Sequence, residues 1–434
     1  MRVAGSLQRV ISALVLGMLL ISCGDLHAKG KRRRKRRAAR TAVLRATAKS
    51  EVPLFSKSYH KTYTDDEIGR LNGKPVVWTV SDTLPFGELL PSWNALRPEQ
   101  GYLLISTSVK FNGKWTKWQN FAKWGRGALG RPLQKTFLNK TSSLVHTKHS
   151  RVEMQRRLGR GFKIRVHFCK GASPTCLKKL GANIARLKNQ KIILPEVSKL
   201  ASVYVKRGIT GISQFMLNHA QKNSICSPVS TSMVVGYYHS ELYGKKPHHS
   251  MARYATDFTH KVHDQALGIF GNWPLNTAEA FHATNGEVYF SVQRLNSFYD
   301  LHHHLMQRTP VIVSVRRLKG GATPYANGHL LVVIGWNAKK QRVICLDPAF
   351  SSHQETLKSY PLRAFLNAWG RSNNLSYVPT RKHALVAAAA PVPNLDVDRY
   401  ARHEQPDVQK GLQVELPDLE SVRLLPPMLV DQII

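Results

Sequence analysis

Acidic residues are scarce in this chain of 434 residues. It has 26 Asp and Glu against 64 Lys and Arg, which gives a formal net charge of +38 at pH 7. A chain with so little negative charge is attracted to anionic polymers, and added salt weakens that attraction. The hydrophobic fraction of 42% allows most of the chain to fold, and the length suffices for two cores.

Long hydrophobic runs are also missing. The apolar run at residues 10–21 follows Arg2 and Arg9 and is too short to cross a bilayer as a permanent helix. Basic residues followed by a short apolar run are typical of an export signal. Residues 1–22 are therefore predicted to be a targeting segment.

Cysteine is the third residue type in short supply, with five in the chain. Cys23 ends the run Leu20-Ile21-Ser22-Cys23, which resembles a bacterial lipobox. Cleavage before Cys23 would leave its thiol thioether-linked to diacylglycerol. Gly24 follows, so the Asp associated with inner-membrane retention is absent, and both the outer membrane and the extracellular face stay open. The alternative is an ordinary signal peptide cut after Ala28.

A basic segment follows the signal, since only Gly30 is not basic between Lys29 and Arg37. Such a block cannot bury apolar surface, so residues 23–60 are interpreted as a disordered tether. It is either simply solvated or lies on anionic lipid, where each basic residue contributes roughly 1 kcal/mol. Its place directly after an export signal disfavours nucleic-acid binding, and no specific nucleic acid is expected as a partner.

The remainder divides into two predicted domains and a tail. Residues 61–205 carry short β-branched and aromatic runs between Gly, Pro and Asn, which predicts a β-rich domain. Five of the eight Trp lie between Trp78 and Trp124, and they favour a β-sandwich core over a platform for sugar stacking. Residues 206–385 mix helical and strand patterns, and residues 386–434 are interpreted as a linker and C-terminal tail.

Partners for a metal ion are lacking. The runs His248-His249 and His302-His303-His304 have no acidic residues at suitable spacing, and adjacent His residues on a helix point in different directions. No metal and no other cofactor is predicted. Cys169 and Cys176 flank a turn with Gly and Pro, so a disulfide between them is an option in an oxidising envelope. Cys345 is expected to be a buried thiol in a strand.

Cys226 has a different setting from the other cysteines. It is followed by Ser227-Pro228 and by apolar residues four positions apart, such as Val229, Met233 and Tyr237. This pattern predicts a buried helix with Cys226 in its first turn, where Pro is tolerated. The helix dipole lowers the pKa of a thiol there, most of all beside an imidazolium. A nucleophilic thiolate needs this setting.

Three more residues fit the same chemistry. His329 opens one predicted strand and Asp347 follows the next. If these strands are antiparallel neighbours, both side chains fall at the same end of the sheet. An imidazole backed by a carboxylate is a base held in one tautomer. Gln214 offers an amide donor for an oxyanion, and Gln221 is a second candidate.

Each of these residues also has an ordinary structural interpretation. A Cys in an apolar run is usually an inert core residue, and Asp-Pro is a common turn opener. The order Gln, Cys, His, Asp, with each residue at the end of an element, favours catalysis for the set as a whole.

The same residues resemble cysteine peptidase family 39 in its broader, 39-like sense, a branch of the papain-like fold. By that resemblance Cys226 is the nucleophile, His329 the general base, Asp347 the orienting residue and Gln214 the oxyanion donor. Bacteriocin-processing members carry Gly after the Cys, whereas Ser227 is similar to the secreted 39-like branch, so bacteriocin leaders give no guide to the substrate. The matching stretches are Ser213-Gln214, Cys226 to Tyr238, Gly271 to Ala278, Pro310 to Val315, Gly328-His329 and Asp347-Pro348.

A second resemblance lies upstream. Pro91-Ser92-Trp93-Asn94-Ala95, Gly113 to Trp118 and Lys123-Trp124-Gly125 resemble the β-rich domain that precedes the peptidase in that branch. The expected fold class is α+β, with a papain-like cysteine peptidase domain preceded by a β-sandwich-like domain.

The sequence therefore predicts an exported, lipid-anchored cysteine peptidase or amidase of the cell envelope. Its expected partners are a peptide or protein substrate, with cell-wall peptide among the options, and the membrane, through the lipid and the tether. Two alternatives stay open: an envelope adhesion or binding protein with a non-catalytic papain-like domain, and a Cys-dependent acyltransferase.

Overall fold

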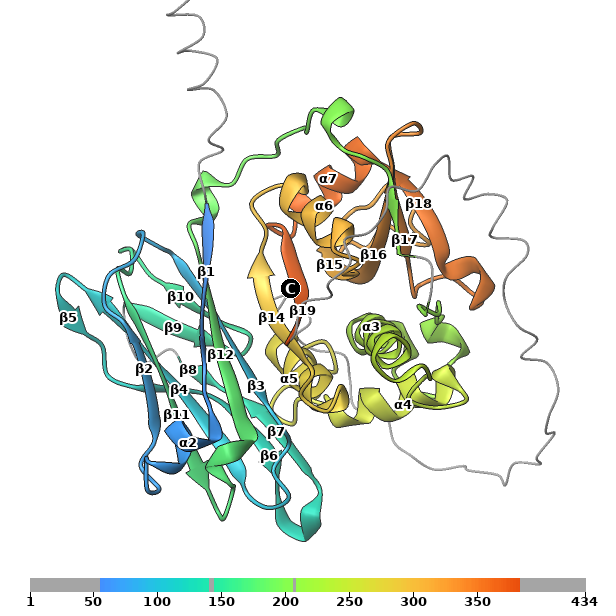
Figure 1. Ribbon diagram of the computed structural model, residues 1–434. Coiled ribbons are helices and arrows are strands. Elements are labelled where there is room, and N and C mark those ends of the chain that lie inside the picture. Colours follow the sequence, from blue (N-terminus) through green and yellow to red (C-terminus); the bar gives the residue numbers. More distant parts are fainter. Residues whose placement is uncertain (1–54, 140–143, 206–207, 383–434) are drawn as a thin grey trace, which may run out of the picture. The chain divides into compact units, whose positions relative to one another are not determined.

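The computed structural model describes residues 55–139, 144–205 and 208–382 (Figure 1). The predicted signal peptide, Cys23, most of the tether and the predicted tail at 386–434 lie outside these residues. The N-terminal part is built from β-sheets, and the C-terminal part combines helices with a sheet. This arrangement confirms the predicted α+β class.

Residues 55–185, here called the β-rich region, form two sheets within the described chain. Helix α2 (Asp65–Gly69) lies between their first two strands in sequence and carries a capping box made by Thr64 and Glu67. The first sheet has the spatial order β1 (Ser56–Thr62), β12 (Leu177–Ala185), β3 (Glu88–Ala95), β10 (Arg151–Met154), β9 (Val145–Lys148) and β8 (Leu138–Asn139).

The second sheet of the β-rich region packs against the first. In its strand β11 (Phe162–Cys169), the side chains of Phe162, Ile164 and Val166 are fully buried, and the residues between them are only partly buried. A period of two is what one buried face requires. The spatial order is β2 (Val76–Val80), β11, β4 (Tyr102–Phe111), β6 (Gln119–Arg126) and β7 (Pro132–Thr136), with β5 (Lys114–Trp115) paired to β4.

The tryptophans of this region divide between core and surface. Trp93 and Trp124 are fully buried in the core between the sheets, as predicted. Trp115 and Trp118 are only partly buried, and each lies against a basic side chain of β11, at 4.2 Å and 4.3 Å from ring centroid to charged group. The sandwich therefore uses most of its Trp residues as packing units.

Residues 203–381, here called the C-terminal region, contain the third sheet and the helices packed against it. All nine residues of β16 and all five of β15 are buried, as expected for strands covered on both faces. The spatial order is β14 (Val288–Arg294), β19 (Leu375–Arg381), β15 (Val311–Val315), β16 (His329–Asn337), β17 (Arg342–Leu346) and β18 (Leu357–Pro361), with β13 (Val203–Tyr204) paired to β16.

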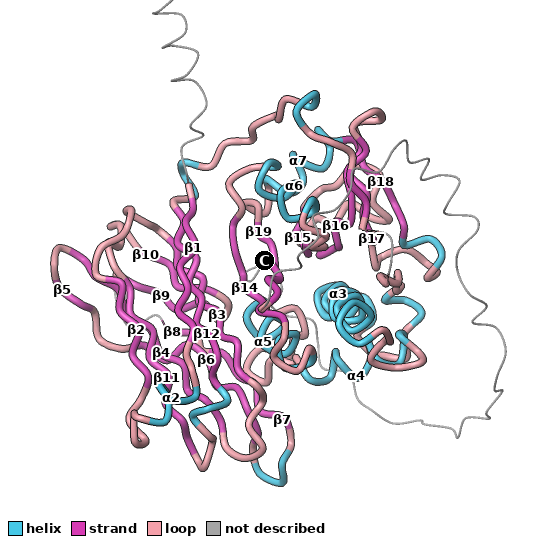
Figure 2. Tube along the Cα trace, viewed as in Figure 1, coloured by secondary structure: helices cyan, strands magenta, loops and turns pink. Residues whose placement is uncertain are grey.

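Helices cover both faces of the third sheet (Figure 2). Ile312 of β15 packs into the core on the α3 side, whereas Val311 and Val313 pack on the α7 side. None of the described helices is long and apolar enough to cross a membrane. The helices are α3 (Cys226–Tyr243), α4 (Met251–Lys261) and α5 (Trp273–Ala283) in the first core, and α6 (Phe298–Met306) and α7 (Leu362–Gly370) in the second.

Strand β3 joins the two regions, because all eight of its residues are buried. Trp93 points into the sandwich core, and Ser92 and Asn94 point to the opposite face. There the Phe290 N–H donates to Asn94 Oδ1 (2.6 Å), and the Val292 N–H donates to Ser92 Oγ (3.0 Å). Backbone groups of β14 are thus satisfied by side chains of the β-rich region.

Two predicted boundaries are corrected by these pairings. Residues 56–60 were expected in the disordered tether, but they form most of β1, which pairs with β12 along its whole length. Residues 203–204 were expected in the β-rich domain, but they form β13, which pairs with β16. In both cases pairing with a distant strand decides the structure, and local composition carries no sign of it.

The disulfide that the sequence left as an option is not formed, because Cys169 and Cys176 are both free thiols. Cys169 ends β11 in the second sheet, and its Sγ lies 3.9 Å from the His167 carbonyl oxygen. Cys176 precedes β12 of the first sheet and is buried in the core, where burial raises the pKa of its thiol to about 12. The turn carries the chain from one sheet to the other and leaves the two thiols in different surroundings.

Candidate active site

Cys226 is the first residue of α3, as predicted, and it is partly exposed. The preceding residue Ile225 and the following Ser227 and Pro228 are buried, which fixes the start of the helix in the core. Ser227 Oγ lies 2.9 Å from the Tyr377 hydroxyl on β19. The thiol therefore lies at the positive end of a helix whose first turn is anchored to the sheet.

His329 and Asp347 lie at the same end of the third sheet. Strand β16 begins at His329, β17 ends one residue before Asp347, and the two strands are antiparallel neighbours, which is the condition that the sequence left open. His329 Nε2 and Asp347 Oδ1 are 2.7 Å apart, and both side chains are buried. The structure therefore brings together two residues that are 18 positions apart in the sequence.

Cys226 interacts with the other side of the His329 ring. Burial alone would raise the pKa of the Cys226 thiol, but the charge of His329, its hydrogen bond and the Leu330 N–H together hold that pKa below its ordinary value. Burial would likewise lower the pKa of His329, but Asp347 and Cys226 raise it above its usual range. Both shifts favour the thiolate–imidazolium pair over the neutral pair.

Asp347 is held by more hydrogen-bond donors than the sequence indicated. The Tyr325 hydroxyl donates to its Oδ2 at 2.9 Å and the Tyr360 hydroxyl at 2.7 Å, and the Ala349 N–H donates to Oδ1 at 3.1 Å. Burial would raise the pKa of this carboxyl, but His329, Tyr360 and Ala349 lower it overall. The carboxylate therefore stays ionised although it is fully buried.

Tyr325 makes a second contact at the site. Its ring stacks on the His329 ring with 4.1 Å between centroids and 20° between planes. Its backbone φ is +49°, an uncommon value for a bulky residue. Its hydroxyl also accepts the Ala322 N–H at 2.9 Å. Sequence reasoning missed Tyr325 and Tyr360, because neither belongs to a motif that marks it.

The two glutamine candidates differ in their surroundings. Gln214 begins a short 3-10 helix, its backbone N–H donates to the Pro348 carbonyl (2.8 Å), and its side chain is buried with Oε1 unpartnered. Gln221 is exposed on the loop before α3. Gln214 is thus tied to the loop that carries Asp347, which makes it the better placed of the two.

Among the described residues, the remaining candidates form no hydrogen bond with Cys226, His329 or Asp347. Cys345 is fully buried in β17, where burial raises the pKa of its thiol well above its usual value. His302 is buried on α6, and its Nε2 lies 2.8 Å from the Ala201 carbonyl oxygen. Within the described residues no group of three His, Cys, Asp or Glu side chains could hold a metal ion.

Comparison with known proteins places this site in a family context. Residues 208–377 match the Peptidase_C39 like family, and residues 27–175 match the Peptidase C39 N-terminal domain. These matches confirm both resemblances drawn from the sequence. No curated protein is significantly similar to the chain.

Among the solved structures that the chain resembles is the crystal structure of xylellain, a cysteine protease from Xylella fastidiosa. It shares 12% sequence identity, and the match covers 46% of this chain and 94% of that chain with a TM-score of 0.25. At this TM-score the likeness carries no weight beside the two family matches.

Proposed function

Because residues 208–377 match the peptidase C39-like family, we propose that this protein is a cysteine peptidase that hydrolyses amide bonds with Cys226, His329 and Asp347. Cysteine peptidase is the enzyme class that the family match supports. The observation that carries the finer proposal is the alignment of a partly exposed thiol, an imidazole and a buried carboxylate in one chain of contacts.

The proposed reaction begins with the thiolate–imidazolium pair. The Cys226 thiolate attacks the amide carbonyl carbon, and the carbonyl π electrons move onto oxygen. The Cys226 backbone N–H and the Gln214 amide are the proposed donors to this oxyanion. As the C–N bond breaks, His329 gives its proton to the leaving amine, and an acyl-thioester remains on Cys226.

Hydrolysis of the acyl-enzyme restores the starting state. The neutral His329 takes a proton from water as the water oxygen attacks the thioester carbonyl. The C–S bond then breaks and returns a thiolate beside an imidazolium. Asp347 holds the ring through Nε2, which leaves Nδ1 for the thiol, and Tyr325 and Tyr360 hold the carboxylate in turn.

The test uses two alanine variants of free thiols. Cys226→Ala should abolish hydrolysis of a casein or mixed-peptide substrate and remove alkylation by iodoacetamide at that position, measured by mass spectrometry. Cys169→Ala is the matched control, since Cys169 is also a partly buried free thiol, and it should retain full activity. Unchanged hydrolysis by Cys226→Ala would refute the nucleophile. An acylated amine formed when an amine is added would indicate acyl transfer.

We also propose that the protein is anchored in the cell envelope through Cys23, with the basic segment after it held near anionic lipid. The support is the Leu20-Ile21-Ser22-Cys23 run and the density of basic residues that follows. Cys23→Ala should shift the protein from the membrane fraction to the soluble fraction and remove a diacylglycerol mass from the N-terminal peptide. Membrane association that persists without that mass would overturn the lipid anchor.

A further inference from the structure

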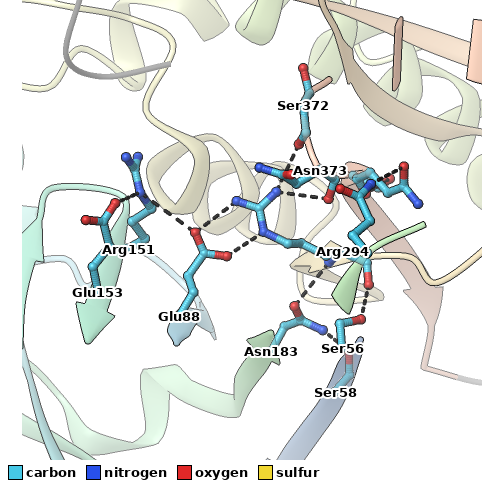
Figure 3. Close-up of polar contacts among 12 residues, drawn as sticks. Ser56, Ser58, Glu88, Arg151, Glu153, Asn183, Arg294, Ser372 and Asn373 are labelled. Atoms are coloured by element: carbon cyan, nitrogen blue, oxygen red, sulfur yellow. Dashed lines mark hydrogen bonds and ion pairs between the residues drawn. The ribbon is translucent and has the colours of Figure 1, made fainter. Parts of the chain in front are cut away.

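A cavity of about 140 Å³ lies between the β-rich region and the C-terminal region. This is well above the roughly 10–15 Å³ that one water needs. Its wall is rich in charged side chains, and Figure 3 shows part of this network, with Glu88 between Arg151 and Arg294. The charged lining residues are Arg151, Arg294, Arg316, Arg371, Glu88 and Glu153.

Both glutamates of the cavity are already paired. Glu88 binds the guanidinium of Arg294 through both oxygens, with 2.9 Å between Oε1 and Nη2, and lies 3.8 Å from Arg151 Nε. Glu153 binds Arg151 Nε at 2.7 Å and Lys148 Nζ at 2.8 Å. The two carboxylates therefore face three cations, Arg294, Arg151 and Lys148, and leave no negative charge to balance the other arginines of the cavity.

The other two arginines leave a surplus of positive charge. Within the described chain, no carboxylate lies within ion-pair distance of Arg316 or Arg371. Partial burial, and then the charge of Arg151, lower the pKa of Arg316. The Ser372 hydroxyl, also in the lining, is buried without a hydrogen-bond partner. An anion would satisfy both the charge and the hydroxyl.

Two neighbouring strands connect the cavity wall to the site of the thiol. Ser314 of β15 lines it and pairs directly with Leu330 of β16, whose N–H contacts the Cys226 sulfur. Arg316 follows two residues after Ser314, at the end of β15 where Val315 pairs with His329. Neighbouring strands are about 4.8 Å apart, so a single inter-strand spacing separates Ser314 in the cavity wall from Leu330, the residue that contacts the thiol.

We propose that this cavity binds a carboxylate of the substrate through Arg316, the less exposed of its two arginines without a carboxylate partner, so that the enzyme prefers peptides with an acidic side chain or a free C-terminus close to the scissile amide. This inference rests on the proposed peptidase function. The planar guanidinium matches a carboxylate through two parallel hydrogen bonds. Residues of the β-rich region complete the cavity, which gives that region a part in substrate selection.

The test separates binding from catalysis by using the full chain with Cys226→Ala. NMR or calorimetric titrations would compare acetyl-Ala-Glu-Ala-amide with acetyl-Ala-Gln-Ala-amide, and acetyl-Ala-Ala-Ala with its C-terminal amide. We expect at least one acidic peptide to bind about tenfold more tightly than its neutral match. Arg316→Gln should remove this preference and leave the neutral peptides unaffected, and Arg316→Lys should restore part of it.

Arg317→Gln is the matched control, because Arg317 is the next residue, is exposed and does not line the cavity. It should keep the preference. Equal binding of acidic and neutral peptides, or binding of inorganic phosphate with no preference between peptides, would overturn the proposal. A preference that survives Arg316→Gln would do the same. These results do not depend on hydrolysis, so failure of the catalytic test leaves this one readable.

Discussion

Cys176 of the β-rich region and Cys226 of the C-terminal region differ in the direction in which their pKa is shifted. In the β-rich region, burial raises the pKa of Cys176 to about 12. In the C-terminal region, burial pushes Cys226 the same way, but the facing His329 reverses the shift and lowers its pKa. Cys345, in the same sheet as His329, has a raised pKa. A charged partner, and neither burial nor region alone, therefore decides which thiol has a lowered pKa.

Charged groups of the two regions show a related difference. Arg97 of the β-rich region is buried, and its guanidinium binds Glu279 at 2.9 Å, the Gly125 carbonyl at 2.6 Å and the Gln134 side chain at 3.2 Å. These contacts satisfy the charge inside the protein. The pair at Cys226 keeps one partly exposed member, so its charge is available for reaction.

The largest effect is expected from removing the His329 imidazole. His329→Ala leaves only burial and a backbone donor at Cys226, so the thiol pKa should rise above its ordinary value, as it does at Cys176. Hydrolysis should fall on the order of 10⁴-fold in kcat/KM. His302→Ala, which removes another buried His of the same region, should lower activity far less. A thiol pKa in His329→Ala that stays low would contradict the proposed cause.

The next largest effect is expected on stability, from removing the carboxylate partner of the buried Arg97. Glu279→Ala should leave the Arg97 guanidinium buried without its carboxylate and lower the free energy of unfolding by about 3–5 kcal/mol. Urea unfolding followed by circular dichroism would measure it. Glu196→Ala is the comparison, because its pair with Lys199 is exposed on both sides, and no measurable change is expected. Equal effects would show that burial of the pair is unimportant.

The pH dependence of activity and of alkylation tests the shifted pKa values of Cys226 and His329. The lowered pKa of Cys226 places its thiolate below the ordinary thiol range, and the raised pKa of His329 keeps the imidazolium above its ordinary range. Activity should therefore rise through the first apparent pKa and fall through the second, and both belong to the pair. At pH 6, iodoacetamide should modify Cys226 at least tenfold faster in the native protein than in His329→Ala.

The alkylation experiment at pH 6 can also contradict the proposed role of His329. A native protein and a His329→Ala variant with the same alkylation rate at pH 6 would show that the imidazole does not activate the thiol. The rate should be measured by peptide mapping, since Cys169 is partly exposed and supplies an internal reference in the same sample.

The smallest expected effect comes from Tyr325. Tyr325→Phe removes the hydroxyl that donates to Asp347 and keeps the ring stacked on His329, so kcat should fall about fivefold, the equivalent of one hydrogen bond of roughly 1 kcal/mol. Tyr325→Leu removes the stacking as well and should lower kcat further. Steady-state kinetics on both variants, with melting temperatures as the folding control, would measure this. Equal kcat values for the two variants would assign no role to the ring.

Sequence patterns predicted the local features of the site well. Cys226 begins a helix, His329 begins a strand and Asp347 follows a strand, as the apolar patterns indicated, and the structure shows that the two strands are antiparallel neighbours. The patterns failed where a strand is formed by distant pairing, as in β1 and β13, and they could not decide the optional disulfide between Cys169 and Cys176, which is not formed. Periodicity of side chains is a local signal, whereas pairing depends on what lies opposite.

By itself, then, the sequence determined which segments bury their faces and which residues fall at element ends, because these follow from spacings of a few residues along the chain. Only the tertiary structure decided that Tyr325 and Tyr360 hold Asp347, and that four arginines from both regions meet around one cavity. The physical reason is that a hydrogen bond or an ion pair depends on which elements pack together, and that choice is made by the whole chain.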